Sequence, residues 1–308
     1  MKHEYGERPA SKATVLACYL AIYFIWGSTY LGISISIRTA PIFLANAIRF
    51  VAAGAALVLI ARGRGASLPN RACLAVSVKS GILSFFISFW LLTSAEQILP
   101  SSTAALIISL EPAWFVIFDW IFFSGAKPNR RIMLSQAVGF AGCAILVMGE
   151  GASARPAGIS MAHYAASALS VVAASVAWVY GALLSSKSRD SHPDPAMASG
   201  LQMLSGGVVF TACAALAGDF SRANDISAES WLALAYLALF GSIVSYYAYI
   251  LLLRTQPVSK VSTHSFVNPI VAVALGWAIA GEAVTIYTAA ATSLVVASVI
   301  GIIYSNRR

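Results

Sequence analysis

The feature that most constrains this chain is a series of apolar stretches, each long enough to cross a lipid bilayer as a helix. A hydrocarbon core of about 30 Å takes roughly 20 helical residues. The polar connectors between the stretches are too short to form a separate soluble domain. We therefore expect an all-α membrane protein whose function lies inside the membrane. The sequence predicts ten spans: 13–35, 42–61, 73–94, 101–123, 132–149, 159–185, 195–217, 230–253, 258–280 and 285–304.

The distribution of charge indicates how these spans are oriented. The net charge is +8, which in a soluble protein would suggest a nucleic-acid partner. With the N-terminus in the cytoplasm, however, fourteen basic residues face the cytoplasm and three face outside, which is a positive-inside asymmetry. We therefore expect no nucleic-acid partner and two cytoplasmic termini. The cytoplasmic residues are Lys2, Arg8, Lys12, Arg62, Arg64, Arg71, Lys127, Arg130, Arg131, Lys187, Arg189, Arg254, Arg307 and Arg308, and the outer ones are Arg38, Arg155 and Arg222.

Neither a targeting segment nor a cysteine framework is predicted. Twelve polar residues precede a first span that is too long for the core of a signal peptide, so we expect the first helix to be retained. Cysteines lie in or beside four different spans without the spacing of metal ligands, and they are predicted to be buried small apolar residues. We expect no disulfide, metal or cofactor.

The second half of the chain repeats features of the first half. Pro100 and Pro257 are 157 positions apart, and so are Pro112 and Pro269. An offset of 152 matches a further set of residues nearer the N-terminus. These pairs are Trp26 with Trp178, Pro41 with Pro193 and Gly54 with Gly206. Five spans is an odd number, so the second half enters the membrane from the opposite side. The sequence predicts two inverted repeats, residues 1–150 and 151–308, around a pseudo-two-fold axis in the membrane plane.

A proline lies near the middle of span four (Pro112) and of span nine (Pro269). Proline removes a backbone donor and kinks a helix, a defect that lipid tolerates only beside a polar neighbour or a water-filled cavity. The preceding residues, Glu111 and Asn268, are polar, which favours a central cavity between the two helices. A purely structural kink at each proline is the alternative.

Few ionisable residues lie at membrane depth, where they usually mark a functional path. Arg49 in span two and Glu111 in span four lie at similar depth and are predicted to pair. Lys79 and Asp119 form a second candidate pair toward the cytoplasmic side. For both pairs, a structural salt bridge competes with a role in binding substrate or protons.

Other polar residues are interpreted by their position along a span. Lys260 and Glu282 lie near span ends, where snorkelling to the interface is the expected behaviour. His264 and Asn268 are four residues apart and share one face of span nine. His264 can titrate near neutrality without help, so it is a candidate cavity group, with a satisfied buried histidine as the alternative.

Aromatic residues gather on the spans expected at the centre. Span three carries Lys79, Phe86 and Trp90 along one stripe. These rings predict either an aromatic-lined cavity for flat or apolar ligands or ordinary core packing. Spans one, six and eight add Trp26, Tyr30, Trp178, Tyr180, Tyr246 and Tyr247.

Four segments carry a resemblance to a known family: "IWGSTYLG" (25–32), "IRF" (48–50), "LEPAWFVIF" (110–118) and "GE" (281–282). With them, the chain resembles the drug/metabolite transporter superfamily, and more closely the ten-helix EamA-type bacterial exporters. The resemblance covers the whole chain. It implies a central cavity lined by spans such as three, four, eight and nine, and export of amino acids or small toxic compounds across the inner membrane. The residues that match the family motifs are Trp26, Arg49, Glu111, Pro112 and Glu282.

The chain departs from the family pattern at three places. "SGAKP" (124–128) lacks the acidic residue that often follows this glycine. Asn268 stands where an acid is more usual, and Leu201 occupies the place equivalent to Arg49. These departures argue against a proton-coupled mechanism and leave the predicted fold unaffected.

The leading hypothesis is an alternating-access exporter of neutral or aromatic amino acids, or of related small metabolites, acting as a monomer or homodimer. Export of toxic drugs is the alternative within the same class. A passive channel would need a ring of charges or a carbonyl filter, and neither is evident. An intramembrane serine hydrolase is disfavoured because His264 and Ser265 lie on different helix faces. The sequence contains no Walker A lysine motif, so nucleotide hydrolysis is not expected.

Overall fold

A computed structural model describes residues 11–124, 127–153, 155–186, 194–256, 258–261 and 263–305. Within these ranges every regular element is a helix. Several residues used in the predictions lie outside the described residues: Lys2, Arg8, Gly125, Ala126, Lys187, Arg189, Pro193, Pro257, Arg307 and Arg308.

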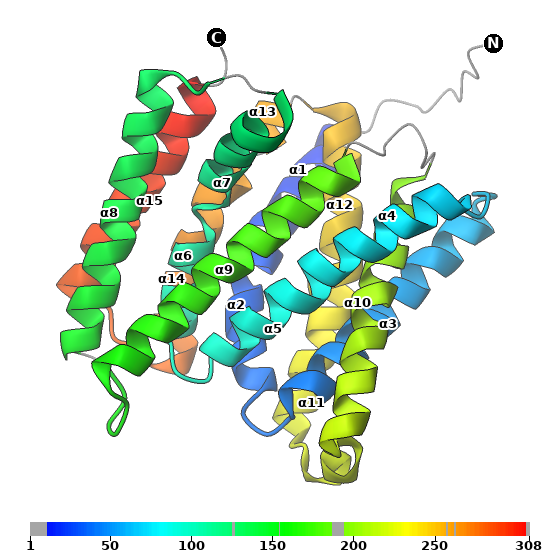
Figure 1. Ribbon diagram of the computed structural model, residues 1–308, viewed down its shortest axis with the longest axis horizontal. Helices are drawn as coiled ribbons and strands as arrows, with labels where there is room; N and C mark the ends of the chain where they lie inside the picture. Colours follow the sequence, from blue (N-terminus) through cyan, green and yellow to red (C-terminus); the bar gives the residue numbers. More distant parts are fainter. Residues whose placement is uncertain are drawn as a thin grey trace.

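Several spans are built from helices that continue into one another (Figure 1). The first five comprise α1 (Lys12–Leu20), η1 (Ala21–Ile25) and α2 (Trp26–Ser36); α3 (Ile42–Gly63); α4 (Arg71–Gly81), η2 (Ile82–Ile87) and α5 (Ser88–Ala95); α6 (Ser101–Ile108), α7 (Glu111–Phe118) and η3 (Asp119–Ser124); and α8 (Arg130–Ser153). The remainder comprise α9 (Met161–Ser186); α10 (Pro195–Ala217) and the short η5 (Asp219–Asp225); α11 (Ala228–Tyr236), η6 (Leu237–Val244) and α12 (Ser245–Thr255); α13 (Val258–Val261) and α14 (His264–Ala280); and α15 (Ile286–Ser305).

The helical runs follow the predicted spans closely. Nine runs within the described residues are long and apolar enough to cross a bilayer. The exception is the predicted span 258–280, which is divided into α13 and α14, and α14 has only 17 residues. An all-α membrane protein is therefore confirmed, with nine long apolar spans and one shorter apolar helix.

Polar caps and glycines set the helix ends. The side chains of Ser11, Asn70, Asp194 and Ser227 each accept a hydrogen bond from a backbone N–H three residues ahead, which satisfies a free donor of the first turn. At the other end, α14 stops at Gly281, whose φ of 68° is in the left-handed region that glycine adopts readily. The connectors are consequently short, and neighbouring helices are held close together.

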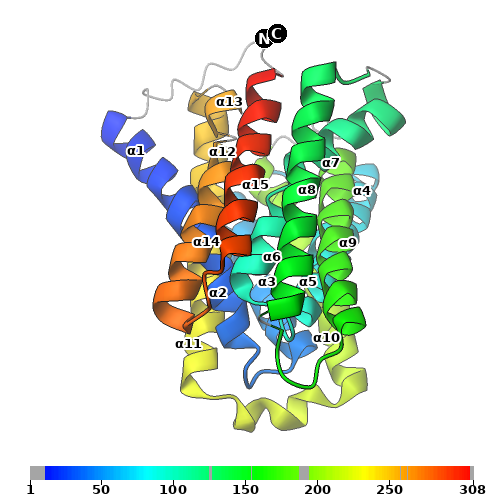
Figure 2. The ribbon, with the colours of Figure 1, turned by 90° about the vertical axis from the view of Figure 1, so that its left-hand side faces the viewer.

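The α1 helix begins and α15 ends near one face of the molecule, which we call the termini face (Figure 2). At the opposite, far face, α2 ends and α11 begins (Figures 1 and 2). The α5, α8 and α14 helices also end toward the far face (Figure 1).

Helices at corresponding places in the two halves pack against each other. The α3 helix contacts α10, α8 contacts α15, and α6 contacts α14 (Figures 1 and 2). In addition, α2 of span one contacts α11 of span eight, and α5 of span three contacts α9 of span six. If each helix is replaced by its counterpart in the other half, the same five contacts are obtained.

The α3–α10 contact is a seam of glycines. A Cβ on Gly54 would lie 2.8 Å from the carbonyl oxygen of Gly200, and one on Gly200 would lie 2.9 Å from that of Gly54. A Cβ on Gly207 would lie 2.9 Å from the backbone nitrogen of Val51. The two backbones approach so closely that no larger side chain fits between them.

Four spans contain a π-helical stretch, and two of these stretches correspond between the halves. The first residue of η2 precedes the first residue of η6 by 155 positions, and the last residue of η2 precedes the last residue of η6 by 157. A π turn leaves carbonyl groups outside the α-helical ladder and often occurs at functional sites. In η6 the hydroxyls of Ser242 and Ser245 donate to the carbonyls of Leu237 and Phe240, five residues back, at 3.0 and 2.9 Å.

Candidate functional site

Span four is broken where its proline was predicted to kink it. The α6 helix ends at Ile108, and α7 begins at Glu111, so Pro112 lies in the first helical turn, where a missing N–H is tolerated. The hydroxyl of Ser109 donates to the carbonyl of Leu106 at 2.7 Å, which satisfies an acceptor freed by the break.

Span nine is organised differently. Pro269 lies inside the continuous helix α14, and the interruption of the span comes before His264. The structure therefore places the two prolines in different settings, one at a helix start and the other within a helix.

Arg49 is buried in the bundle, with an exposed fraction of 5%. Its Nε donates to Ser242 in η6 at 3.2 Å, and its guanidinium carbon lies 5.0 and 4.9 Å from the ring centres of Phe50 and Phe89. Within the described residues it forms no ion pair with Glu111, and its Nη1 is buried without a hydrogen-bond partner. The predicted Arg49–Glu111 pair is absent because the guanidinium is held by a hydroxyl of η6 and by two rings, Phe50 on its own helix and Phe89 on α5.

The second predicted pair is also absent. Lys79 is exposed on α4 and forms no ion pair with Asp119 in the described part of the chain. On the same stripe, Trp90 is 42% exposed and stacks at 6.3 Å on Phe86, which is half-buried. The stripe therefore turns partly outward, because its other side is needed for the packing of α4 and α5 against α9.

Trp26 and His264 form one cluster with Tyr249. The rings of Trp26 and His264 meet edge to face at 5.2 Å, and Tyr249 lies 5.2 Å from Trp26 and 5.8 Å from His264. The indole N–H of Trp26 donates to the carbonyl of Gly241 in η6 at 3.1 Å. The Nδ1 of His264 is buried without a partner. This cluster joins spans one, eight and nine.

Asn268 faces the backbone of the π-helical η1. With its amide nitrogen placed as the donor, it lies 3.1 Å from the carbonyl oxygens of Ile22, Tyr23 and His264. A carboxylate in that place would face three acceptors and no donor. This geometry suits an amide at position 268 and disfavours a carboxylate there.

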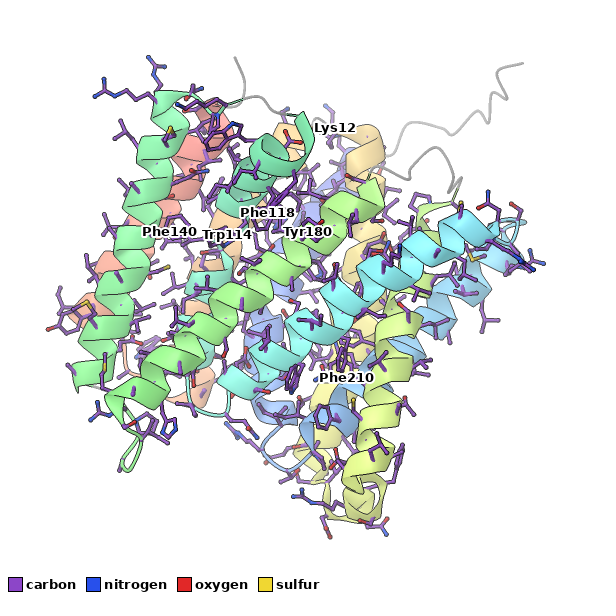
Figure 3. The ribbon with its side chains drawn as sticks, viewed as in Figure 1. Lys12, Trp114, Phe118, Phe140, Tyr180 and Phe210 are labelled. Carbon is purple, nitrogen blue, oxygen red and sulfur yellow. The ribbon has the colours of Figure 1, made fainter. Side chains whose placement is uncertain are left out.

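Two further aromatic groups lie on either side of α9. Trp178 meets Phe85 and Phe89 edge to face, at 5.3 and 6.0 Å. Tyr180 meets Phe118 at 6.2 Å (Figure 3). Trp178 and Tyr180 thus join span six to spans three and four, respectively.

The remaining predicted tyrosines have local roles. Tyr30 is half-buried and packs against the main core, and the hydroxyl of Tyr246 bonds to Ser199 of α10. Tyr247 is 45% exposed, with Arg64 over its ring at 5.0 Å.

Glu282 contradicts the snorkelling interpretation. Its carboxylate turns inward and accepts four hydrogen bonds from the start of α6. The donors are the backbone N–H groups of Ser101 and Ser102, at 2.7 and 3.0 Å, and their hydroxyls, at 2.7 and 2.5 Å. An acceptor with negative charge is favoured at a helix N-terminus. We call this connection between α14 and α6 the latch. Lys260, by contrast, is exposed.

Two buried glutamates were missed in the sequence because both follow long apolar runs and resemble connector residues. Glu150, 3% exposed, accepts from the hydroxyls of Thr103 and Thr288 at 2.6 Å and of Tyr164 at 3.3 Å. Glu96 directly follows α5 and is 5% exposed. A signal was present: spans three and five both end with a glutamate, as does the "GE" segment after span nine.

Of the two cavities described in the structure, only the smaller is lined by a predicted site residue, Arg49. One of about 10 Å³, room for a single water molecule, is lined by polar groups of Ser36, Asn46, Arg49 and Thr93. The other, of about 340 Å³, opens between the α2–α3 connection and the end of α10. Neither is lined by Glu111, His264 or Asn268.

Known proteins resemble this chain over most of its length. The inner membrane transporter YedA of Escherichia coli (strain K12), described as uncharacterized, is 34% identical over 263 residues, covering 85% of this chain and 81% of YedA. Protein PecM of Dickeya dadantii is 26% identical over 254 residues, covering 82% of this chain and 80% of PecM.

A solved crystal structure supports the same fold. It superposes with a TM-score of 0.66 at 21% identity, covering 96% of this chain and 99% of the other. The model of the EamA-like transporter family matches residues 13–148 and 165–304. Two copies of one family domain, together with the apolar helices described above, identify the chain as a transporter rather than an enzyme. The chain belongs to the EamA-like transporter family.

Proposed function

We propose that this protein is a secondary transporter of the bacterial inner membrane that exports neutral or aromatic amino acids, or related small metabolites, by alternating access. The observation that carries the proposal is the packing of α3 on α10, α6 on α14 and α8 on α15. Contacts that persist when the halves are exchanged support two inverted repeats, near 1–150 and 151–308, around a central site.

A carboxylate in span four and a group of aromatic rings from spans one, eight and nine support an amino acid as the substrate. Glu111 starts a helix at a break and has no hydrogen bond within the described residues, so its carboxylate is available for an ammonium group. The rings of Trp26, Tyr249 and His264 can pack against a flat side chain. A strongly anionic substrate would need more cations than this region supplies.

We also propose that both termini lie in the cytoplasm and that the protein lies in the inner membrane. The positive-inside asymmetry supports cytoplasmic termini, so the termini face would be cytoplasmic and the far face periplasmic. The name of the relative YedA supports the inner membrane. The protein would act as a monomer or a homodimer, with the bilayer and the solute as its partners.

Counterflow in proteoliposomes tests the function. Vesicles holding the purified protein are loaded with one unlabelled amino acid, and uptake of the same labelled amino acid is measured across a panel of neutral, aromatic, acidic and basic members. Accumulation of neutral or aromatic members is the expected result. Transport of only phosphorylated or nucleotide-linked compounds would refute the substrate class and leave the fold intact.

Matched variants connect the activity to the site. His264→Ala and Asn268→Ala are expected to reduce exchange while the protein still reaches the membrane in normal amounts. His163→Ala, an exposed histidine of α9, is the control for the first and Asn224→Ala, exposed in η5, for the second. Equal losses in site and control variants would argue against a site at this cluster.

A further inference from the structure

Glu96 is a buried carboxyl group without any hydrogen-bond partner. Both of its carboxylate oxygens are inaccessible and unpaired, and the residue is 95% buried at the end of α5. Burial of an unpaired ionised carboxylate is costly, so such a group tends to hold a proton or to move toward a cation. Ionisable groups in this situation mark proton and ion paths in membrane proteins.

Two charged groups act on the charge of Glu96: Glu282 after α14 and Arg49 from α3. Glu96 in turn acts on Tyr30 of α2. Glu111 also acts on Tyr30. Arg49 attracts an ionised Glu96, whereas Glu282 repels it. The charge on Glu96 therefore depends on both the guanidinium of Arg49 and the carboxylate of the latch.

The structure holds Glu96 and Arg49 apart. No ion pair joins them in the described residues, and Nη1 of Arg49 is also unpaired. The water-sized cavity beside Arg49 is lined by Thr93, which lies one helical turn before Glu96. A small movement of Glu96 toward this cavity would bring two unsatisfied and opposite groups together.

We propose that Glu96 is a proton-binding site that couples the latch, and with it opening at the far face, to the proton gradient. With a proton on Glu96, the carboxylate of Glu282 is not repelled and the latch between α14 and α6 stays closed. When the proton leaves, Glu96 pairs with Arg49 and repels Glu282, so the latch weakens. This inference rests on the proposed function, since it supplies the driving ion of that exporter.

The direction of coupling follows from these states. A proton taken from the periplasm closes the far face, is released to the cytoplasm after the change of access, and so moves inward as the solute moves outward. The departures at Asn268 and Leu201 do not exclude this scheme, because Glu96 lies at neither position.

A first test needs no substrate. Ala104, fully buried in α6 behind the latch, is replaced by cysteine in the full-length protein in nanodiscs, and alkylation of that position is followed by mass spectrometry. The rate is divided by that of Asn224→Cys, at an exposed position of η5, to remove the intrinsic pH dependence of thiols. We expect the ratio to rise at least about five-fold from about pH 5.5 to about pH 8, the low end of coupling between linked sites.

Three variants decide the outcome. Glu96→Gln is expected to keep the low ratio at both pH values, and Glu282→Gln to give a high ratio at both because the latch has lost its charge. Glu229→Gln, exposed on α11, is the control and should behave as the parent. A parent ratio that does not change with pH, or a full pH response in either Glu96→Gln or Glu282→Gln, overturns the proposal. If Glu96→Gln does not fold, the pH response of the alkylation ratio in Glu282→Gln still tests the proposal.

Proteoliposome flux separates this inference from the proposed function. Exchange of labelled phenylalanine without a pH gradient reports transport alone, and the acceleration of net efflux by an imposed gradient reports coupling. Glu96→Gln should retain the first and lose the second. Absence of exchange for every amino acid of the counterflow panel refutes the proposed function, and the alkylation ratio then still tests the role of Glu96. Exchange with an unchanged gradient response in Glu96→Gln refutes the role of Glu96.

Discussion

The two halves of span four, α6 and α7, are equally long but differ in how they are held in the bundle. All eight residues of α6 are buried, whereas in α7 only Ala113 is buried. The start of α6 is bonded to Glu282, and its Thr103 is bonded to Glu150. The start of α7 has Glu111, which forms no hydrogen bond within the described residues.

This difference shows where the bundle is held closed. At the far face, carboxylates from two other spans fix α6 in place, while nearer the termini face α7 is held mainly by ring contacts such as Trp114 with Phe140 at 5.2 Å (Figure 3). Charged hydrogen bonds are stronger and more directional than such contacts. In the proposed orientation, these charged hydrogen bonds hold α6 on the periplasmic side.

The largest expected effect on this contrast comes from Glu282→Ala. It leaves two backbone donors and two hydroxyls of α6 without an acceptor, and we expect the free energy of unfolding to fall by about 3 kcal/mol. Denaturant unfolding in mixed micelles measures it, with Glu229→Ala as the exposed control. A loss no greater than in the control would mean that the latch does not hold α6.

Glu150→Gln should follow in size. The amide keeps one acceptor oxygen but loses the charge that binds three hydroxyl groups, so we expect a loss of about 2 kcal/mol in the same assay. Thr103→Val, which removes a single donor, should cost less. If Thr103→Val costs as much as Glu150→Gln, the bonds to Thr288 and Tyr164 contribute little.

Gly276→Ala should disturb the latch by steric conflict, without changing any charge. A Cβ at this position would contact Oε2 of Glu282 and lie 2.9 Å from its Cδ, so the carboxylate must shift. We expect a loss of about 1 kcal/mol. Gly63→Ala, with open space around its Cβ in α3, should be neutral or stabilising. Equal behaviour of the two variants would show that the carboxylate has room to move.

Glu111→Gln should have the smallest effect on stability, within about 0.5 kcal/mol, because no hydrogen bond within the described residues is lost. Its effect on counterflow should be large if the carboxylate binds an ammonium group. A stability loss as large as that of Glu150→Gln would mean that α7 is held as firmly as α6, and would remove the contrast.

The sequence was sufficient for the spans because apolar length alone determines them. It also identified Pro112 and Asn268 as unusual, since a proline and an amide inside a membrane helix require partners. The ion pairs could not be predicted in the same way. Residues at equal depth, such as Arg49 and Glu111, can point in different directions because each helix is rotated about its own axis. The sequence does not determine that rotation.

The inward orientation of the carboxylates at the far face could not be predicted for a related reason. A glutamate at the end of a span can turn toward solvent or back into the bundle, and the choice depends on which helix start lies beside it. Glu282 turns inward because the unpaired N–H groups of Ser101 and Ser102 are there to receive it. That neighbour comes from a distant part of the chain.

The glycine seam between α3 and α10 has a mechanical consequence. Where two backbones touch without intervening side chains, the helices can neither slide nor separate without losing that fit. If one half of the molecule rocks against the other, we expect this contact to be kept and the movement to turn about it. Probes on outward-facing positions of α3 and α10, away from these glycines, would therefore give a fixed reference for the movement of the other helices.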